Sequence, residues 1–149
     1  MVAPSRLRLS SRVLLMSPGG SCLLFNTLAP DSSGYRRWIT PGGGVKAHES
    51  HEKAAQRELF EETGRMFDDV GQSVWRHQFD VTFDRADHNQ GYAEFFLVRT
   101  EPFDPVTIFW TPEEHLEVSD WGWFTAEQLI ELEQPYEPNE LPELIRRFR

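Results

Sequence analysis

The sequence predicts a mixed α/β fold in a single domain, and three observations support this. The chain has 149 residues, the length of one domain whose core needs no disulfides or metals as staples. Short β-prone stretches alternate with segments of helical spacing, without internal repeats, low-complexity tracts or linkers. Hydrophobic residues make up 39% and aromatic residues 13% of the chain, which argues against disorder.

Two strands are predicted at the start of the chain, at residues 5–16 and 21–26. A Pro-Gly-Gly-Ser turn at 18–21 joins them as a hairpin. The first 30 residues hold several arginines and serines but no acid, which superficially resembles a transit peptide. We favour folded strands, because the apolar residues of this stretch follow a strand pattern rather than that of an amphipathic helix.

The clearest helix is predicted after a run of glycines. Residues 27–37 are rich in turn formers and are expected to form a surface loop before the glycines at 42–44. Ser50 is a suitable N-cap, because its hydroxyl can accept a hydrogen bond from the first turn. The helix is expected to run to Thr63, with Gly64 in the left-handed position that ends many helices.

The rest of the chain continues the alternation of strand and helix. Its predicted elements are, in order, a strand at 73–83, a polar turn at 84–91, a buried strand at 92–100, a loop over most of 101–118, a short strand at 121–124, a helix opened by a capping box at 125–128, and a last helix from about Asn139.

Charge and composition exclude several classes of protein. A formal net charge of −9 argues against general nucleic-acid binding through electrostatic attraction. The single cysteine, Cys22, leaves no internal disulfide and favours a reducing, cytoplasmic location. No apolar run approaches the roughly 18 residues of a membrane span, so no membrane partner is expected. An acidic protein that handles phosphate groups needs a local device, such as divalent cations held by carboxylates.

An acid-dense segment at the end of the predicted helix is the strongest candidate for such a device. Glu58, Glu61 and Glu62 stand at i, i+3 and i+4, on one side of the helix. Ala55 and Leu59 mark the adjacent face that should pack inward. Taken alone, the segment is better explained as an ordinary solvated acidic face.

Three neighbouring features reverse that interpretation. Gly42, Gly43 and Gly44 supply backbone that can approach a ligand without a Cβ in the way. Glu49 lies at the junction of loop and helix, and Arg57 directly precedes the acids. A pair between Glu49 and Arg57 would fix the loop against the helix.

The spacing of these residues resembles the Nudix box. The matching pattern is Gly43-x5-Glu49-x7-Arg57-Glu58-Leu59-x-Glu61-Glu62-x-Gly64. The order of the strands also resembles the family, so the similarity covers nearly the whole chain. It implies an α/β/α sandwich with a mixed β-sheet. One position departs from the family pattern: Arg65 stands where the box usually ends with an aliphatic residue, and we expect Met66 or Phe67 to take over its packing.

The resemblance also implies a reaction. Members of this family carry out Mg²⁺-dependent hydrolysis of a nucleoside diphosphate linked to another group. By position, Glu58, Glu61 and Glu62 resemble the metal ligands, with the carbonyl of Gly42 as a helper. One of the acids also activates water, and Glu61 or Glu58 is the expected base. Hard oxygen ligands suit Mg²⁺, with Mn²⁺ as an alternative.

Other roles stay open from the sequence. Arg57 and Glu49 correspond to the orienting pair of the family. A loop acid, Glu113 or Glu114, is an alternative general base. Candidates for substrate binding are Arg36, Arg37 and Trp110.

The expected partner is a small nucleotide-type molecule, but the sequence does not indicate which one. A homodimer is compatible with the family, although no interface is evident. Two other hypotheses are a non-catalytic Nudix-like nucleotide or metabolite sensor and a purely structural acidic domain.

Overall fold

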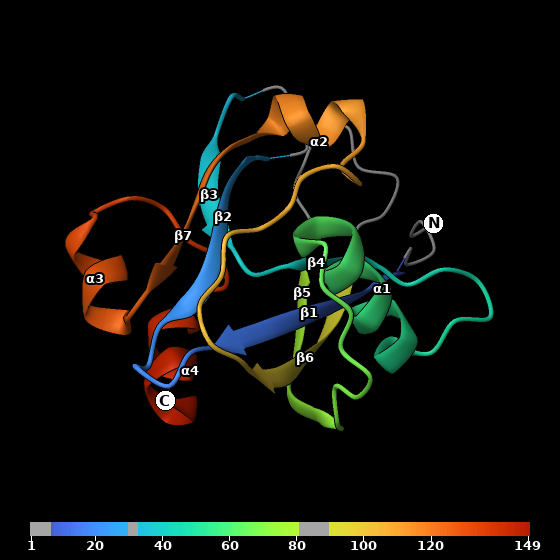
Figure 1. Ribbon diagram of the computed structural model, residues 1–149. Coiled ribbons are helices and arrows are strands. Elements are labelled where there is room, and N and C mark those ends of the chain that lie inside the picture. The colour runs from blue at the N-terminus through green and yellow to red at the C-terminus, as the bar shows by residue number, and fades with distance from the viewer. Residues whose placement is uncertain (1–6, 30–32, 81–89) are drawn as a thin grey trace.

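The computed structural model describes residues 7–29, 33–80 and 90–149, which form strands and helices in alternation (Figure 1). The elements are β1 (Leu7–Met16), β2 (Cys22–Leu28), β3 (Arg36–Ile39), β4 (Gly42–Gly44), α1 (His51–Thr63), β5 (Ser73–Asp80), β6 (Gln90–Arg99), α2 (Pro112–Glu117), β7 (Val118–Phe124), α3 (Ala126–Glu131) and α4 (Leu141–Phe148).

The described strands form one mixed sheet that forks beside β1. The main path runs β3-β2-β1-β6-β5, with β4 on β1 and β7 on β2. β1 pairs with β6 in parallel along its whole length. On its other side, β1 pairs first with β4, over residues 10–12, and then with β2 only at its end, where Met16 faces Cys22. The two arms of the sheet therefore diverge and leave space between β3 and the strands β1, β6 and β5.

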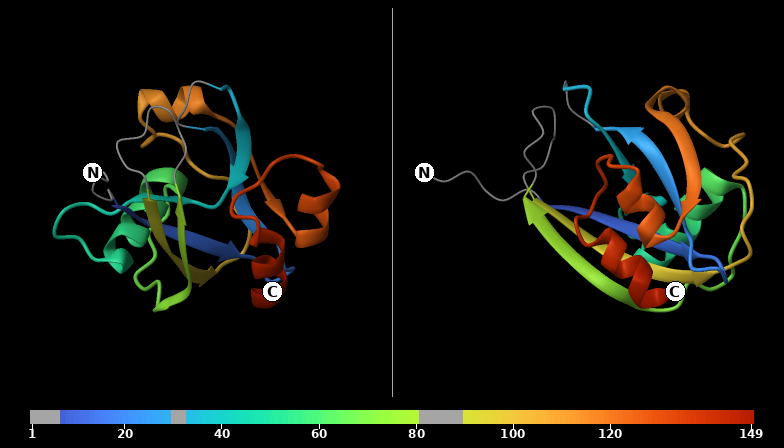
Figure 2. Two further views of the ribbon diagram at one scale, coloured as in Figure 1. Left: turned by 180° about the vertical axis from the view of Figure 1, so that it is seen from behind. Right: turned by 90° about the vertical axis from the view of Figure 1, so that its left-hand side faces the viewer.

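Helices cover both faces of the sheet, which confirms the predicted sandwich (Figure 2). Alternate residues of β1 point to opposite faces, as strand geometry requires. Val13 and Leu15 pack in a core cluster with Ala55 and Leu59 of α1. On the other face, the buried cluster joins β1 to α3 and α4; its members include Leu14, Met16, Cys22, Leu129, Leu141, Leu144 and Ile145.

Helix α1 begins and ends as its sequence predicts. The Ser50 hydroxyl accepts a hydrogen bond from the backbone N–H of Lys53. Gly64 is left-handed, with φ of 79°, and its N–H donates to the carbonyl of Phe60. Leu59 is the one large apolar side chain that α1 buries completely, so the hold of α1 on the sheet depends heavily on it.

Two predicted loops are wrong in part. The loop at 27–37 is shorter, because β2 continues to Leu28 and β3 already begins at Arg36. The loop at 101–118 contains α2, which opens with a capping box between Thr111 and Glu114. Pro112 in the first turn adds to this start, since proline fits there without losing a helical hydrogen bond. Three prolines and several acids in this stretch had favoured a loop.

The remaining boundaries agree with the predictions or differ slightly. β6 begins at Gln90 rather than 92, and β7 at Val118 rather than 121. β5 ends at Asp80 within the described part of the chain. The predicted continuation of that strand over 81–83, and the predicted turn up to 89, lie outside the described residues.

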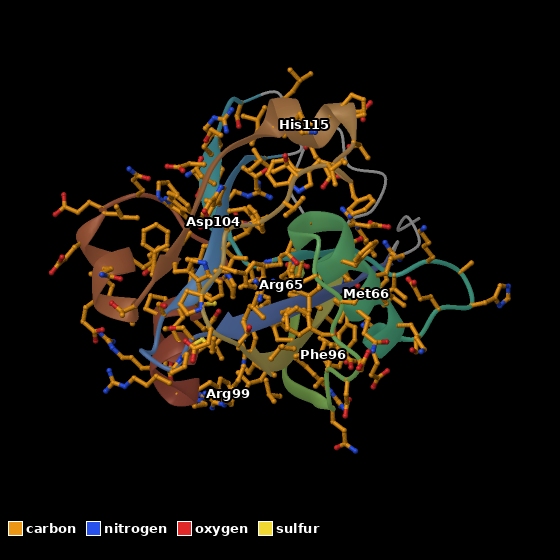
Figure 3. The ribbon with its side chains drawn as sticks, in the orientation of Figure 1. Arg65, Met66, Phe96, Arg99, Asp104 and His115 are labelled. Atoms are coloured by element: carbon orange, nitrogen blue, oxygen red, sulfur yellow. The ribbon has the colours of Figure 1, made fainter. Side chains whose placement is uncertain are left out.

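Arg65 is accommodated by packing at the end of α1 (Figure 3). Its guanidinium lies over the ring of Phe103, 3.9 Å from the ring centroid. Phe67 packs against the core cluster on the α1 face. Met66 is 77% exposed, so of the two residues expected to take over this packing it is Phe67 that does so.

Two further features of the fold concern the predictions about membrane spans and about Cys22. No helix in the described residues is long and apolar enough to cross a membrane. Cys22 is completely buried at the start of β2, and burial raises the pKa of its thiol to about 12.

Candidate functional site

The glycine strand β4 lies unusually close to its neighbours. Gly42 faces Arg12 in the pairing of β4 with β1, and its φ is 146°. A Cβ on Gly42 would lie 2.2 Å from the carbonyl oxygen of Ser11, so only glycine fits. A Cβ on Gly43 would lie 2.5 Å from Oε1 of Glu58. The glycines therefore allow an acid of α1 to approach the backbone.

Glu58, Glu61 and Glu62 of α1 line one pocket of about 340 Å³ together with β4. The side chain of Glu58 is only 13% exposed, whereas that of Glu61 is 39% exposed. The N–H of Gly42 donates to Oε2 of Glu62 at 3.2 Å. The predicted acidic face is thus a pocket wall rather than a solvated surface.

Arg57 organises the acids. Its Nε and Nη2 donate to the two carboxylate oxygens of Glu49 at 2.8 and 2.9 Å, which forms the predicted orienting pair. Nη1 donates to Glu58 at 2.9 Å and to Glu61 at 3.3 Å. Nη2 also donates to the carbonyl of Gly44 at 2.9 Å. The bond to Arg57 lowers the pKa of Glu49 to about 2, and the bond to Glu49 raises the pKa of Arg57.

Glu62 differs from Glu49, because its pKa is raised rather than lowered. Burial raises the pKa of its carboxyl well above the usual range, and the neighbouring charge of Glu58 adds to this. Arg12 and the N–H of Gly42 act in the other direction but are outweighed. Two carboxyl groups held this close without a cation favour sharing a proton, and a bound cation would relieve the same repulsion.

The donor set fits a hard divalent cation. Glu58, Glu61 and Glu62 offer carboxylate oxygens and Gly42 a carbonyl, which are the ligands that Mg²⁺ or Mn²⁺ prefers. In the described residues, no group of three or more acidic, histidine or cysteine side chains is already arranged as a metal cluster. In the structure, Arg57 pairs with Glu58 and with Glu61.

The segment after β6 secures the end of α1 beside the acids. The indole Nε1 of Trp110 donates to the carbonyl of Glu62 at 2.9 Å. The N–H of Val106 donates to the carbonyl of Thr63, also at 2.9 Å. Both carbonyls belong to the last turn of α1, where no helical partner exists. Trp110 also lines the acid pocket and packs edge-on against Phe25.

The structure separates the other candidate residues. Arg37 lines the acid pocket, but Arg36 does not, and its guanidinium donates to the carbonyl of Glu117 at 2.9 Å. Glu114 lines the pocket while its carboxylate caps α2. Glu113 is exposed and is not part of the pocket wall. The roles of these residues stay predictions.

Three charged residues that line the acid pocket were not among the candidates predicted from the sequence. Arg8 and Arg12 reach the pocket from β1, and Glu117 reaches it from α2. The available signal for Arg12 was a charge in the middle of an apolar β-prone stretch. Nothing in the local sequence marks Glu117, because its position depends on how α2 packs across the site.

Comparisons with known proteins agree with this geometry. The family model of the NUDIX domain matches residues 6–148. The RNA pyrophosphohydrolase of Erythrobacter litoralis is 28% identical over 97% of this chain and 92% of its own. The RNA pyrophosphohydrolase of Roseobacter denitrificans is 31% identical over 66% of each chain.

Solved structures share the fold at lower identity. The MutT protein of Methanosarcina mazei superposes with a TM-score of 0.73 at 21% identity, over 99% of this chain and 96% of its own. The MutT NUDIX hydrolase of Burkholderia pseudomallei gives a TM-score of 0.69 at 21% identity, over 97% and 98%.

The fold and the site thus define a hydrolase that acts on phosphoric anhydride bonds. The chain belongs to the Nudix family.

Proposed function

We propose that this chain is a Mg²⁺-dependent pyrophosphohydrolase that cleaves a nucleoside diphosphate linked to another group, by attack of water on phosphorus. The single observation that carries the proposal is the pocket in which Glu58, Glu61 and Glu62 face β4. Three acids on one pocket wall repel one another, and a bound divalent cation would relieve this repulsion.

Each residue has a distinct part in the proposed reaction. Glu58, Glu61, Glu62 and the carbonyl of Gly42 would hold the ion, with Mn²⁺ as a possible replacement for Mg²⁺. When bound, the ion neutralises the diphosphate and acidifies a water molecule. Arg57, fixed by Glu49, positions the carboxylates.

Glu61 is our choice for the general base. It is more exposed than Glu58, so it can reach a water molecule in the pocket. Glu58 is the second candidate. Glu114 is a third, because it lies in the same pocket, but its carboxylate would first have to release the backbone N–H of Thr111.

The substrate is a free nucleotide compound or the 5′ end of an RNA. The two curated relatives are named for RNA pyrophosphohydrolysis, which supports a 5′-polyphosphate RNA end as one candidate. A panel should therefore contain nucleoside triphosphates, nucleotide sugars, dinucleoside polyphosphates and a short 5′-triphosphate RNA.

The first test compares the wild type with Glu61→Gln and Glu62→Gln on this panel, with and without Mg²⁺. We expect release of phosphate, pyrophosphate or a nucleoside monophosphate from at least one compound, and a loss of at least 100-fold in both variants. Glu52→Gln is the matched control, since Glu52 is exposed in the first turn of the same helix. Equal activity in all four proteins would refute the assigned roles.

A ligand sensor without turnover is the alternative function. It predicts binding of a nucleotide but no product with any divalent metal. Isothermal titration of the same panel, followed by product analysis of each bound compound, separates the two functions.

A further inference from the structure

A second, larger pocket lies next to the acid pocket in the fork of the sheet. It has a volume of about 470 Å³ and is walled by β1, β3, β5 and β6, with residues 137–139 at its rim. The two pockets share four residues, Arg12, Arg37, Ile39 and Thr40. Two of the four are arginines, so the junction of the pockets is a positively charged point in an acidic protein.

Arg12 is fixed at this junction by one end only. Its Nη1 donates to the carbonyls of Thr40 and Gly42 at 3.1 and 3.2 Å. Within the described residues, the hydrogen bonds of the Arg12 guanidinium all come from Nη1. Because Arg12 lines both pockets, Nε and Nη2 are the donors that it can offer to a ligand.

Arg37 approaches the junction from the opposite strand, β3. It is 8% exposed; its Nη1 donates to the carbonyl of Thr27 at 3.2 Å, and its Nε lies 3.4 Å from Glu137. Arg12 and Arg37 therefore bring two guanidinium groups to one junction, and guanidinium groups form strong charge-assisted hydrogen bonds with phosphate oxygens.

The far wall of the larger pocket is aromatic. The rings of Trp75, His77 and Phe79 follow one face of β5 and stack in sequence, with centroids 5.0 and 5.1 Å apart. His77 and Phe79 line the pocket, and Phe79 is 39% exposed. Tyr35 stands on the opposite side and is 40% exposed. Partly exposed aromatic side chains in a pocket can stack on planar ligands.

We propose that Arg12 and Arg37 form an anion subsite that holds a phosphate group of the substrate, with the ring system attached to that phosphate in the larger pocket. This inference rests on the proposed function, because it assigns the acid pocket to the cleaved anhydride. It also makes the substrate a nucleotide that carries its base on the β5 side. Arg12 and Arg37 then set which phosphate lies over the acids.

The test uses the full chain in the presence of EDTA, so that no metal contributes to binding. Each of AMP, GMP, CMP and UMP is titrated against the wild type, together with its nucleoside as the probe without phosphate. We expect at least one monophosphate to bind at least tenfold more tightly than its nucleoside. That ratio should fall to within threefold of unity in Arg12→Gln and in Arg37→Gln.

Two variants control for indirect effects. Arg76→Gln removes an arginine of β5 whose side chain is exposed and lies outside both pockets, and it should keep the wild-type ratio. Arg12→Lys keeps the charge and should recover part of the phosphate preference. A purely structural role of Arg12 would lower the melting temperature while leaving the ratio of phosphate to nucleoside affinity unchanged.

Two results would overturn the inference: the absence of any phosphate preference in the wild type, or an equal preference in the wild type and both glutamine variants. Neither depends on turnover. If Mg²⁺-dependent cleavage is found without this preference, the proposed function stands and the subsite fails. If the preference is found but no compound is cleaved, the subsite stands and the proposed reaction fails.

Discussion

Arg57 engages three carboxylates and one backbone carbonyl at once. The bidentate contact with Glu49 is the strongest of these, because both oxygens accept charge-assisted bonds at 2.9 Å or less. The side chain of Glu49 is only 15% exposed, so water screens the pair weakly. Glu49 thus stabilises the fold through its charge, in addition to orienting Arg57.

Replacing Glu49 should give a pH-dependent loss of stability. The pKa of Glu49 lies near 2 in the folded protein against an ordinary 4.5. A carboxyl group whose pKa is lower in the folded than in the unfolded protein stabilises the fold. This stabilisation is complete at pH values above the pKa of the unfolded state, and it is lost as the pH falls toward 2. Glu49→Gln should therefore cost about 2 kcal/mol at neutral pH. Urea unfolding of both proteins should give a difference that shrinks steadily below about pH 4.5.

Glu131→Gln serves as the control for this measurement. Glu131 is an exposed acid at the end of α3, away from the acid pocket. Its replacement should change the free energy of unfolding by less than about 0.5 kcal/mol at any pH. A difference between wild type and Glu49→Gln that stays constant with pH would contradict the role assigned to the Glu49 charge.

Individual residues also show which contacts could be predicted from the sequence. Glu49 and Arg57 pair as predicted because their spacing lets the loop fold back on the first turns of α1. Arg65 shows the limit: its partner Phe103 lies 38 positions later, and only the packed chain brings the two together. No local pattern around Arg65 reveals that contact.

Among the elements, β4 is the one whose composition matters most for the site. A methyl group on Gly43 would meet the carboxylate of Glu58, which is the far end of a flexible side chain. Gly43→Ala should thus displace Glu58 at a cost to stability below about 1 kcal/mol. We expect a rise of at least tenfold in the Mg²⁺ concentration that gives half-maximal hydrolysis.

Gly44→Ala is the matched control for this substitution. A Cβ on Gly44 would find Nη2 of Arg8 at 3.5 Å, an ordinary contact. The Mg²⁺ requirement of Gly44→Ala should remain within threefold of the wild type. Equal Mg²⁺ titrations for both variants would show that the close approach of β4 to Glu58 does not affect metal binding.

Helices were predictable where the sequence shows a hydrophobic pattern of helical spacing. In α1 and α3 a side-chain cap accompanies this pattern, whereas α4 has no side-chain cap and was expected from its pattern alone. α2 has a complete capping box at Thr111 and Glu114 but buries none of its residues. Without an apolar face, the cap was its one signal in the sequence, and the surrounding prolines obscured it.

At the scale of the whole molecule, one core cluster holds α1, which carries the acids, and a second cluster on the other face of the sheet holds α4. Leu59 anchors α1 on one face, and Ile145 anchors α4 on the other; both are completely buried. Leu59→Ala and Ile145→Ala should each cost about 2–4 kcal/mol. Only Leu59→Ala should also lower kcat at least tenfold, because α1 carries the acids. Urea unfolding and initial rates at a temperature where both variants stay folded would check this.

Ile145→Val provides a graded comparison, since it removes one methylene and should cost about 1 kcal/mol. Its activity should equal that of the wild type. If Leu59→Ala and Ile145→Ala lost kcat to the same extent, the acids would depend on the whole fold rather than on the packing of α1.

The layered arrangement was predictable as a whole, whereas the fork of the sheet was not. Strand patterns indicate which residues are extended, but they do not state that β1 pairs with β4 over Ser10–Arg12 and with β2 only at its end, at Met16. The larger pocket and the meeting of Arg12 with Arg37 both depend on that divergence. For this reason the acids were found from the sequence and the arginine junction was not.

The burial of Cys22 makes the chain convenient for site-specific labelling. It is the only thiol in the sequence, it is inaccessible, and its pKa of about 12 leaves almost no thiolate at neutral pH. A cysteine introduced at an exposed position, such as Met66, would be modified by maleimide reagents far faster than Cys22. A fluorophore or spin label can therefore be placed beside the end of α1 without first removing the native cysteine.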